Sequence, residues 1–296
     1  MWEYIFVLIA VVLFSVQFVF TKKYQQASGS GMASTFLFNT ISPVAFVIIL
    51  FFMDGMKIEV TWFAFILAFL WALVCNVCSY FSIKALELGS LTNYSLYLMS
   101  GGMILPILYG AIIERDPFSI PKLIGILVII TAMFVKMDFK EKTNWKVMAC
   151  FLLLFLLNGS VGVISSVYQS KQLAFDKVSS IQFSLLGNLF RAVIGAIMYF
   201  GYLLRGRERE EKNSLEVVSY VKGAPWAAIC GICNGVANLL LLMALVALAP
   251  SLQYPLVTGG CIVLSAVFGL FFKEKISLQV GISVLLAMMG TIIMAL

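Results

Sequence analysis

The sequence predicts an all-α membrane protein with ten transmembrane helices, arranged as two inverted repeats of five helices. Three observations carry this prediction. The chain of 296 residues is 62% hydrophobic and 11% charged, it contains ten long apolar runs, and its second half repeats patterns of its first. Soluble domains are usually about 45–50% apolar and about 25% charged. A soluble core of this size cannot bury so much apolar surface, so soluble enzymes and disordered chains are excluded.

The predicted spans follow from the apolar runs. A bilayer core about 30 Å thick requires roughly 20 apolar residues in a helix, and most of the runs have about that length. The runs are continuous rather than alternating, which favours helices over a β-barrel. In order, the predicted spans are residues 3–20, 32–53, 62–83, 91–113, 120–135, 147–170, 180–204, 224–247, 252–272 and 278–296.

The breaks between the runs carry polar or charged residues that hydrocarbon excludes. In order they are Lys22-Lys23, Asp54-Gly55, Lys84, Glu114-Arg115-Asp116, Lys136 to Lys146, Lys171 to Lys177, Arg205 to Lys222, Ala249-Pro250 and Lys273-Glu274-Lys275. The break from Arg205 to Lys222 is expected to form an exposed loop. The first run follows Glu3 and lacks a small-residue cleavage site, so we expect a retained helix rather than a signal peptide.

Short patterns of the first half return in the second half. Ser100-Gly101-Gly102 returns as Thr258-Gly259-Gly260, and Asp116 matches Glu274 at the same separation. Other matches, in the same order along the chain, pair Tyr24-Gln25 with Tyr168-Gln169, Asn39 with Asn188, and Cys75-x-x-Cys78 with Cys230-x-x-Cys233. We therefore expect two repeats, residues 1–141 and 142–296. Because five is an odd number, the second repeat must enter the membrane upside down, an architecture that recurs among secondary transporters.

Two motifs extend this interpretation. Phe14 to Lys22 is similar to a first-helix pattern W-G-s-n-f-v-x-x-K, although Phe14 and Ser15 replace its Trp and Gly. Asp116 to Ser119 with Gly125, and Phe272 to Ser277 with Gly290, are similar to a turn pattern G-E-r-x-s…G. With these motifs the whole chain resembles the ten-helix EamA type of the drug/metabolite transporter superfamily. The resemblance implies a carrier of amino acids, sugars or other metabolites, and an arginine at the place of Arg191, where the first repeat has Ser42 instead.

Polar side chains inside the predicted spans are expected to face the interior of the bundle. Several recur at helical spacing, so that they share a face. The candidate substrate-binding residues are Gln17, Asn39, Asn76, Tyr80, Tyr97, Asn188, Arg191, Asn234, Asn238 and Tyr254. Their amide, hydroxyl and aromatic groups suit a small amphipathic solute that carries a carboxylate or several hydroxyls.

Arg191 is the sharpest of these candidates. A guanidinium at the centre of a transmembrane helix costs roughly 2.5–3.5 kcal/mol on insertion scales, and no Asp or Glu lies in the middle of any run. Either the cargo supplies the counter-charge, or Arg191 caps carbonyls or reaches toward the interface. Lys22 presents the same alternatives of site residue and interfacial anchor.

The residues that are missing also restrict the mechanism. The sequence has no histidine and no acid in the middle of a span, so we expect no proton exchange at a central carboxylate. Facilitated diffusion or exchange of one solute for another fits better. The two C-x-x-C pairs lie in apolar runs at helical spacing, which favours packing contacts over a metal or redox site, and we expect neither a metal nor a cofactor.

Glycine and proline inside the spans indicate either close helix packing or hinges for a rocking movement. The hinge candidates are Gly101, Gly102, Pro106, Pro255, Gly259 and Gly260. Neither glycine pair is followed by the Lys and Ser/Thr of a phosphate-binding loop.

These observations predict a secondary transporter, independent of ATP, that moves a small organic metabolite by alternating access. The solute is expected to be an amino acid or another carboxylate-bearing molecule. A flippase for lipid-linked intermediates and a membrane-embedded enzyme are the alternatives. We expect a multi-pass protein of a bacterial plasma membrane, monomeric or homodimeric, whose partners are the solute and the lipid bilayer and not nucleic acid.

The charge distribution and the family resemblance imply opposite orientations. With ten spans both termini lie on one side, where the loops hold five Lys and Arg residues, against fourteen on the other side. Because Lys and Arg concentrate in cytoplasmic loops, the charges predict termini outside the cell. The resemblance implies cytoplasmic termini.

Overall fold

The computed structural model describes residues 2–53, 59–113, 115, 118–135, 145–169, 176–207, 221–244, 250–274 and 278–295. These residues form ten helices and no strands. In chain order the helices are α1 (Trp2–Ser28), α2 (Met32–Met53), α3 (Trp62–Leu88), α4 (Leu91–Ile112), α5 (Ile120–Phe134), α6 (Trp145–Gln169), α7 (Ser180–Arg207), α9 (Ala224–Ala244), α10 (Pro250–Phe271) and α11 (Leu278–Ala295).

Eight of the described helices are long and apolar enough to cross a membrane. The prediction of an all-α, multi-pass membrane protein is therefore confirmed. Large apolar side chains such as Leu8, Ile197 and Phe200 are more than 60% exposed, as expected of a surface that lipid covers. The shorter apolar helices are α5 and α11. The 15 residues of α5 rise about 22 Å, less than a hydrocarbon core of about 30 Å.

Three helices continue past the ends of their predicted spans into charged breaks, and one of them is α7, which ends at Arg207 rather than at residue 204. α1 continues through Lys22 and Lys23, and α3 continues through Lys84. Lysine favours a helix nearly as well as leucine does, so charge ends the apolar run without ending the helix. Several predicted breaks lie outside the described residues: Asp54-Gly55, Glu114, Asp116-Pro117, Lys136 to Lys142, Lys171, most of the loop from Arg205 to Lys222, Ala249, and Lys275 to Ser277.

Local signals in the sequence fix where helices begin and turn. The hydroxyl of Thr61 caps α3 by accepting the N–H of Ala64, and the hydroxyl of Ser90 caps α4 by accepting the N–H of Asn93. Gly29, between α1 and α2, has a φ of 77°, a conformation that glycine adopts without a steric penalty.

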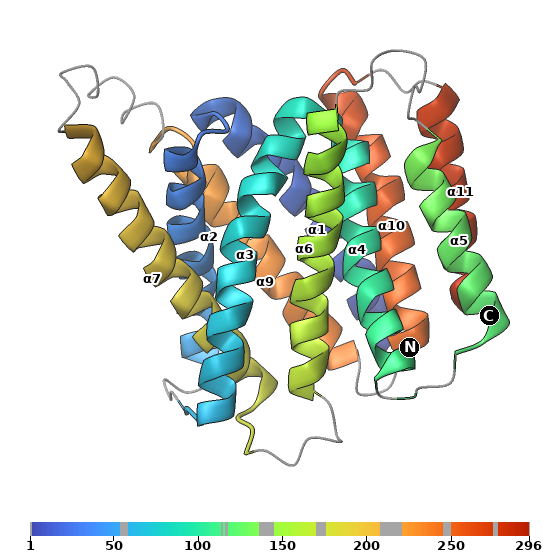
Figure 1. Cartoon of the computed structure of the whole chain (residues 1–296), viewed down its shortest axis with the longest axis horizontal. Coiled ribbons are helices and arrows are strands. Elements are labelled where there is room, and N and C mark those ends of the chain that lie inside the picture. The colour runs from blue at the N-terminus through green and yellow to red at the C-terminus, as the bar shows by residue number, and fades with distance from the viewer. Residues whose placement is uncertain are drawn as a thin grey trace.

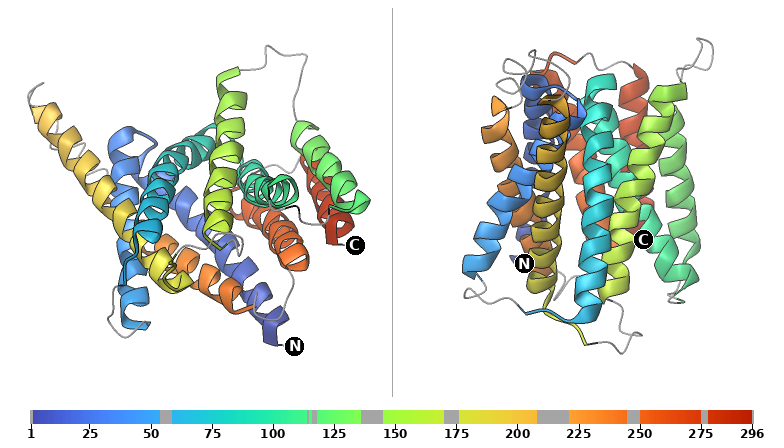
Figure 2. Two further views of the ribbon diagram at one scale, coloured as in Figure 1. Left: turned by 60° about the horizontal axis from the view of Figure 1, so that its bottom comes forward. Right: turned by 60° about the vertical axis from the view of Figure 1, so that its left-hand side comes forward.

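The helices alternate in direction along the chain, so that both termini lie toward the same end of the bundle (Figure 1). We call this the termini end, and we call the opposite end, which holds Lys22, Leu91 and Glu274, the far end. The α5–α11 pair and α7 lie on opposite flanks in Figure 1 and in the left view of Figure 2. The other helices stand between these flanks and surround the interior.

Small residues let the helices approach closely. A Cβ atom on Gly101 of α4 would lie 2.1 Å from the carbonyl oxygen of Phe155 in α6, and one on Gly231 of α9 would lie 1.9 Å from that of Ser42 in α2. Apolar surface gives no driving force between helices in lipid, so close packing of this kind supplies much of their association.

Candidate functional site

A cavity of about 370 Å³ lies inside the bundle, within the size range of small-molecule sites. Its described lining comes from α1, α2, α3, α4, α6, α7, α9 and α10, and from neither α5 nor α11. Toward the termini end the lining reaches Tyr168, Ser180 and Gln253, which lie within one turn of a helix end. Toward the far end it stops at Thr21, Ser82 and Tyr94.

Arg191 lines this cavity and is held in place by two neighbouring helices. Its Nε and Nη2 groups donate to Oδ1 of Asn39 in α2 at 3.3 and 3.1 Å, and Nη2 also donates to the Ser79 hydroxyl of α3 at 2.8 Å. No described acidic side chain pairs with the guanidinium, and its Nη1 has no hydrogen-bond partner among the described residues. The arginine is therefore oriented while its charge is left for another group to balance.

Asn39 and Asn76 lie behind the arginine rather than in the lining. Asn39 is fully buried and donates to the carbonyl oxygen of Asn76 at 3.1 Å. The amide of Asn76 donates to the carbonyl oxygens of Ala72 and Arg191 at 2.9 and 3.4 Å. The two amides, predicted as substrate contacts, thus connect α2, α3 and α7 and support Arg191.

A second polar group crosses from α1 to α9. Asn234 donates to Oε1 of Gln17 at 2.8 Å, and Asn238 donates to the carbonyl oxygen and Oδ1 of Asn234 at 2.8 and 3.1 Å. All three amides line the cavity, as do the predicted residues Asn188 and Tyr254. Asn188 directs its amide to the carbonyl oxygen of Ser184 at 2.8 Å.

Besides Asn39 and Asn76, two more of the predicted residues, Tyr97 and Tyr80, do not reach the described lining. The hydroxyl of Tyr97 donates to the carbonyl oxygen of Met133 in α5 at 2.8 Å, so this side chain connects α4 to α5. Tyr80 packs edge-on against Phe81, with ring centroids 5.4 Å apart. Both roles as substrate contacts stay predictions.

The remaining wall is largely aromatic. It includes Phe14, Phe18, Phe38, Phe46, Trp71 and Tyr94. The cavity therefore combines one cationic group, two sets of neutral amides and hydroxyls, and a broad apolar face. This arrangement suits a solute with a carboxylate at one end and an apolar body at the other.

Five of the six hinge candidates, all except Pro255, have a packing contact with another helix. Cβ atoms on Gly101 and Gly102 would meet Phe155 and Asn158 of α6, and Pro106 packs on Gly162 of that helix. In the second half, a Cβ on Gly259 would lie 2.7 Å from the side-chain oxygen of Thr291, and a Cβ on Gly260 would lie 2.7 Å from a methyl group of Val11. Pro255 lies inside α10. Whether any of them also acts as a hinge stays a prediction.

The cysteines of the two C-x-x-C pairs are free and buried. Cys75 and Cys78 line the cavity, and Cys230 shares a hydrogen bond with the hydroxyl of Thr21 at 3.2 Å. The described residues contain no group of three or more His, Cys, Asp or Glu side chains that could hold a metal ion.

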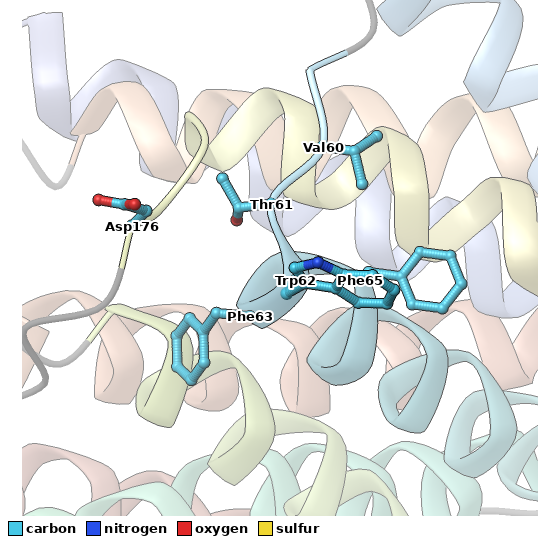
Figure 3. A pocket seen from close by; sticks show the side chains of 6 residues that line it. All are labelled: Val60, Thr61, Trp62, Phe63, Phe65 and Asp176. Carbon is cyan, nitrogen blue, oxygen red and sulfur yellow. The ribbon is translucent and has the colours of Figure 1, made fainter.

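A second hollow, of about 500 Å³, lies at the termini end beside the start of α3. Figure 3 shows Asp176 across from Thr61, with Trp62 and Phe65 to one side. Trp62 is 82% exposed, so this hollow is a shallow feature of the surface. The bundle cavity encloses a solute far better.

Sequence reasoning missed Ser79, Asn158 and Gln253, which also line the cavity. Ser79 follows Asn76 by three positions on a helix, so the spacing rule could have found it. Asn158 and Gln253 donate to the carbonyl oxygens of Leu98 and Leu241 at 2.6 and 2.9 Å. These partners lie on other helices, α4 and α9, and spacing within one helix does not reveal them.

Comparison with known proteins supports the fold and no more. No family model matches the chain, and no curated protein matches it. A solved structure described only as "Crystal structure of protein" is similar, with a TM-score of 0.54 and 15% identity over 97% of this chain and 98% of its own. At that identity the likeness extends to the arrangement of the helices alone.

Proposed function

We propose that this protein is a secondary transporter of small carboxylate-bearing solutes and that Arg191 binds the carboxylate. The observation that carries the proposal is an oriented guanidinium in a cavity between membrane-spanning helices, with no acidic partner among the described residues. Nε and Nη2 are already bonded to Asn39 and Ser79, so the N–H groups of Nη1 are the ones left to donate to a carboxylate. The aromatic wall then accommodates the apolar body of the solute.

We further propose that the chain is an EamA-type member of the drug/metabolite transporter superfamily with inverted repeats. Several contacts support a twofold relation between α1–α5 and α6–α11. α1 packs on α9 as α6 packs on α3, and α2 packs on α9 as α7 packs on α3. α1 and α6 run in opposite directions (Figure 1). A Cβ on Gly125 would meet the carbonyl oxygen of Gly290, and one on Gly290 that of Gly125, so α5 and α11 approach closely through these two glycines.

Such a pair of halves suits alternating access, in which one half rocks against the other around a site between them. The cavity lining draws on helices of both halves. A bacterial plasma membrane is the proposed location.

The test measures binding of a panel of solutes to the purified protein through the change in its unfolding temperature. The panel contains amino acids, other carboxylates, sugars, nucleotides and quaternary amines. We expect carboxylates to raise the unfolding temperature and to be taken up by proteoliposomes. Arg191→Leu should weaken their binding roughly tenfold or more, because a hydrogen bond to a charged group contributes about 1.5–3 kcal/mol.

Two variants make the test specific. Arg191→Lys keeps the charge but loses the guanidinium that Asn39 and Ser79 orient. Its affinity for carboxylates should fall between those of the parent and Arg191→Leu. Arg115→Leu removes an exposed arginine outside the cavity and should leave binding unchanged. Binding of carboxylates by Arg191→Leu at the parent's affinity would remove this residue from the site.

The alternative functions give different outcomes in the same assays. A flippase of lipid-linked intermediates would be stabilised by an amphiphile with a large headgroup and would move fluorescent lipid between leaflets. A membrane-embedded enzyme would convert a solute without net movement across the bilayer. The described cavity lining contains Arg191 as its single basic side chain, which fits a small anion better than a polyanionic headgroup.

A further inference from the structure

An ion pair connects α1 to the end of α10 at the far end of the bundle. Lys22 of α1 donates to Oε1 of Glu274, and the two side chains are only 10% and 13% exposed. The Lys22 ammonium also lies 5.2 Å from the centre of the Phe272 ring. This protection from water distinguishes the pair from Lys84 and Glu87 at the same end, whose side chains are 36% and 41% exposed.

Glu274 also holds the beginning of α4. The backbone N–H of Leu91, the first residue of α4, donates to both carboxylate oxygens, at 2.8 and 3.1 Å. A carboxylate at this position satisfies a free N–H and complements the helix dipole. One side chain thereby connects three helices, α1, α4 and α10.

The turn after α10 places Glu274 there. Lys273 adopts a φ of 57°, and the N–H of Glu274 donates back to the carbonyl oxygen of Gly269 at 3.1 Å, as in the helix-ending turn that favours glycine. The absence of a side chain at Gly269 provides the space for the carboxylate, because a Cβ there would lie 2.7 Å from Oε2 of Glu274.

Two of the three connected helices, α1 and α4, line the cavity just below this point, whereas α10 contributes to the lining only nearer the termini end, between Gln253 and Thr258. Thr21 is the residue before Lys22, and Tyr94 lies one turn after Leu91; both mark the limit of the lining toward the far end. A passage at the far end between α1 and α4 would therefore break the contacts that Glu274 makes with Lys22 and with Leu91.

The alignment of the two repeats does not predict an equivalent of the Lys22–Glu274 pair at the termini end. The match of Tyr24-Gln25 with Tyr168-Gln169 aligns Lys22 with Ser166, and Asp116 stands for Glu274. Asp116 lies outside the described residues. The sequence alone shows that the second repeat has no lysine at the equivalent position.

We propose that Lys22, Glu274 and the N-terminus of α4 form a one-sided gate that holds the far end closed, and that transport requires this ion pair to break. The proposal rests on the alternating-access function proposed above. It explains why a lysine and a glutamate are buried at one end of the bundle although neither lines the described cavity. A gate at the far end favours the conformation that is closed there.

The gate is tested by the access of a thiol reagent to the cavity from the far end. The six native cysteines are replaced with alanine or serine, and Ser82→Cys, in the lining just below the gate, becomes the reporter. A membrane-impermeant maleimide is added to one face of sealed vesicles. A separate Lys84→Cys variant identifies the face that exposes the far end.

We expect Lys22→Met and Glu274→Gln to raise the labelling rate of the reporter at least tenfold, and Lys22→Arg, which keeps the ion pair, to leave it unchanged. Lys84→Met, which removes the exposed pair at the same end, is the matched control and should also have no effect. If Lys22→Met does not fold, Glu274→Gln still decides the question, because its amide oxygen can still accept the N–H of Leu91 while the ion pair is lost.

An unchanged labelling rate in folded Glu274→Gln would overturn the gate. Labelling needs no cargo, so this result is independent of the role of Arg191. Faster labelling in Glu274→Gln together with normal carboxylate binding by Arg191→Leu would keep the gate and reject the proposed binding site. The reverse combination would keep the site and reject the gate.

Discussion

At the scale of single residues, the orientation of Arg191 depends on Asn39. The amide oxygen of Asn39 accepts two N–H groups of the guanidinium, and its own N–H group is used by the carbonyl oxygen of Asn76. That second bond fixes which atom of the Asn39 amide faces the arginine. The asparagine thus presents a neutral acceptor, which orients the charge without cancelling it.

Removal of this acceptor should weaken both the fold and the site. Asn39→Ala leaves two arginine N–H groups without a partner in a buried place, which costs about 1–3 kcal/mol. We expect a lower unfolding temperature and weaker carboxylate binding in the panel assay. Ser79→Ala removes a single bond and should have a smaller effect on both measurements. Equal effects of the two variants would contradict the role given to Asn39.

A charged replacement at the same position separates orientation from charge. Asn39→Asp offers an anion to Arg191 and should keep the protein folded, because the two groups pair in a site shielded from water. The variant should lose stabilisation by added carboxylates, since the guanidinium charge is already balanced. The measurement is the shift of the unfolding temperature with and without solute. A shift equal to that of the parent would show that the solute does not need the charge of Arg191.

Sequence patterns reached part of this site. Helical spacing identified Arg191, Asn188, Asn234 and Asn238, which line the cavity, because residues on one face of one helix can be read from their separation. The spacing did not indicate that Asn39 would face Arg191, since that contact depends on how α2 packs on α7. The pairing of Lys22 with Glu274 joins residues 252 positions apart and also depends on packing between helices.

At the scale of helices, small residues set the distance between neighbours. α4 and α6 meet through Gly101 and Gly159, each of which faces backbone of the other helix. Hydropathy predicted where the chain crosses hydrocarbon, but it did not predict where α1 and α3 end. Lysine is a good helix former, so each helix extends through its lysines beyond the membrane-embedded part. Of the alternatives for the glycine pairs, the structure shows the packing contact directly.

The contact between α4 and α6 should not tolerate a single methyl group. Gly101→Ala places a Cβ within 2.1 Å of the Phe155 carbonyl oxygen, so the two helices must move apart, and overpacking of this kind costs about 1–3 kcal/mol. We expect a lower unfolding temperature in detergent. Gly281→Ala in α11 is the matched control, since nothing lies within 4 Å of its Cβ, and it should be neutral or slightly stabilising. A Gly101→Ala variant as stable as Gly281→Ala would show that the contact is looser than described.

At the scale of the whole molecule, the distribution of charge predicts which end of the bundle faces the cytoplasm, and the cavity then indicates which side it opens toward. The alternation of helices puts Lys22, Lys23, Lys84 and Lys273 at the far end (Figure 1), on the side that holds fourteen of the Lys and Arg residues against five. Lys and Arg are retained in the cytoplasm during insertion. The gated far end would then face the cytoplasm, and the cavity would reach toward the outside.

This orientation predicts that the C-terminus lies outside the cell. Alkaline phosphatase fused after Leu296 should be active, because the enzyme folds only outside the cytoplasm, and green fluorescent protein at the same place should stay dark. Lys84→Cys, at the opposite end of the bundle, should react with an impermeant maleimide in inverted vesicles and not in intact cells. The opposite pattern would place the termini in the cytoplasm, as the resemblance to the EamA type implies.

The closed gate would then face outward, and the cavity would load its solute from the cytoplasm. The reporter therefore decides whether the conformation described here is the one that receives solute for import or for export.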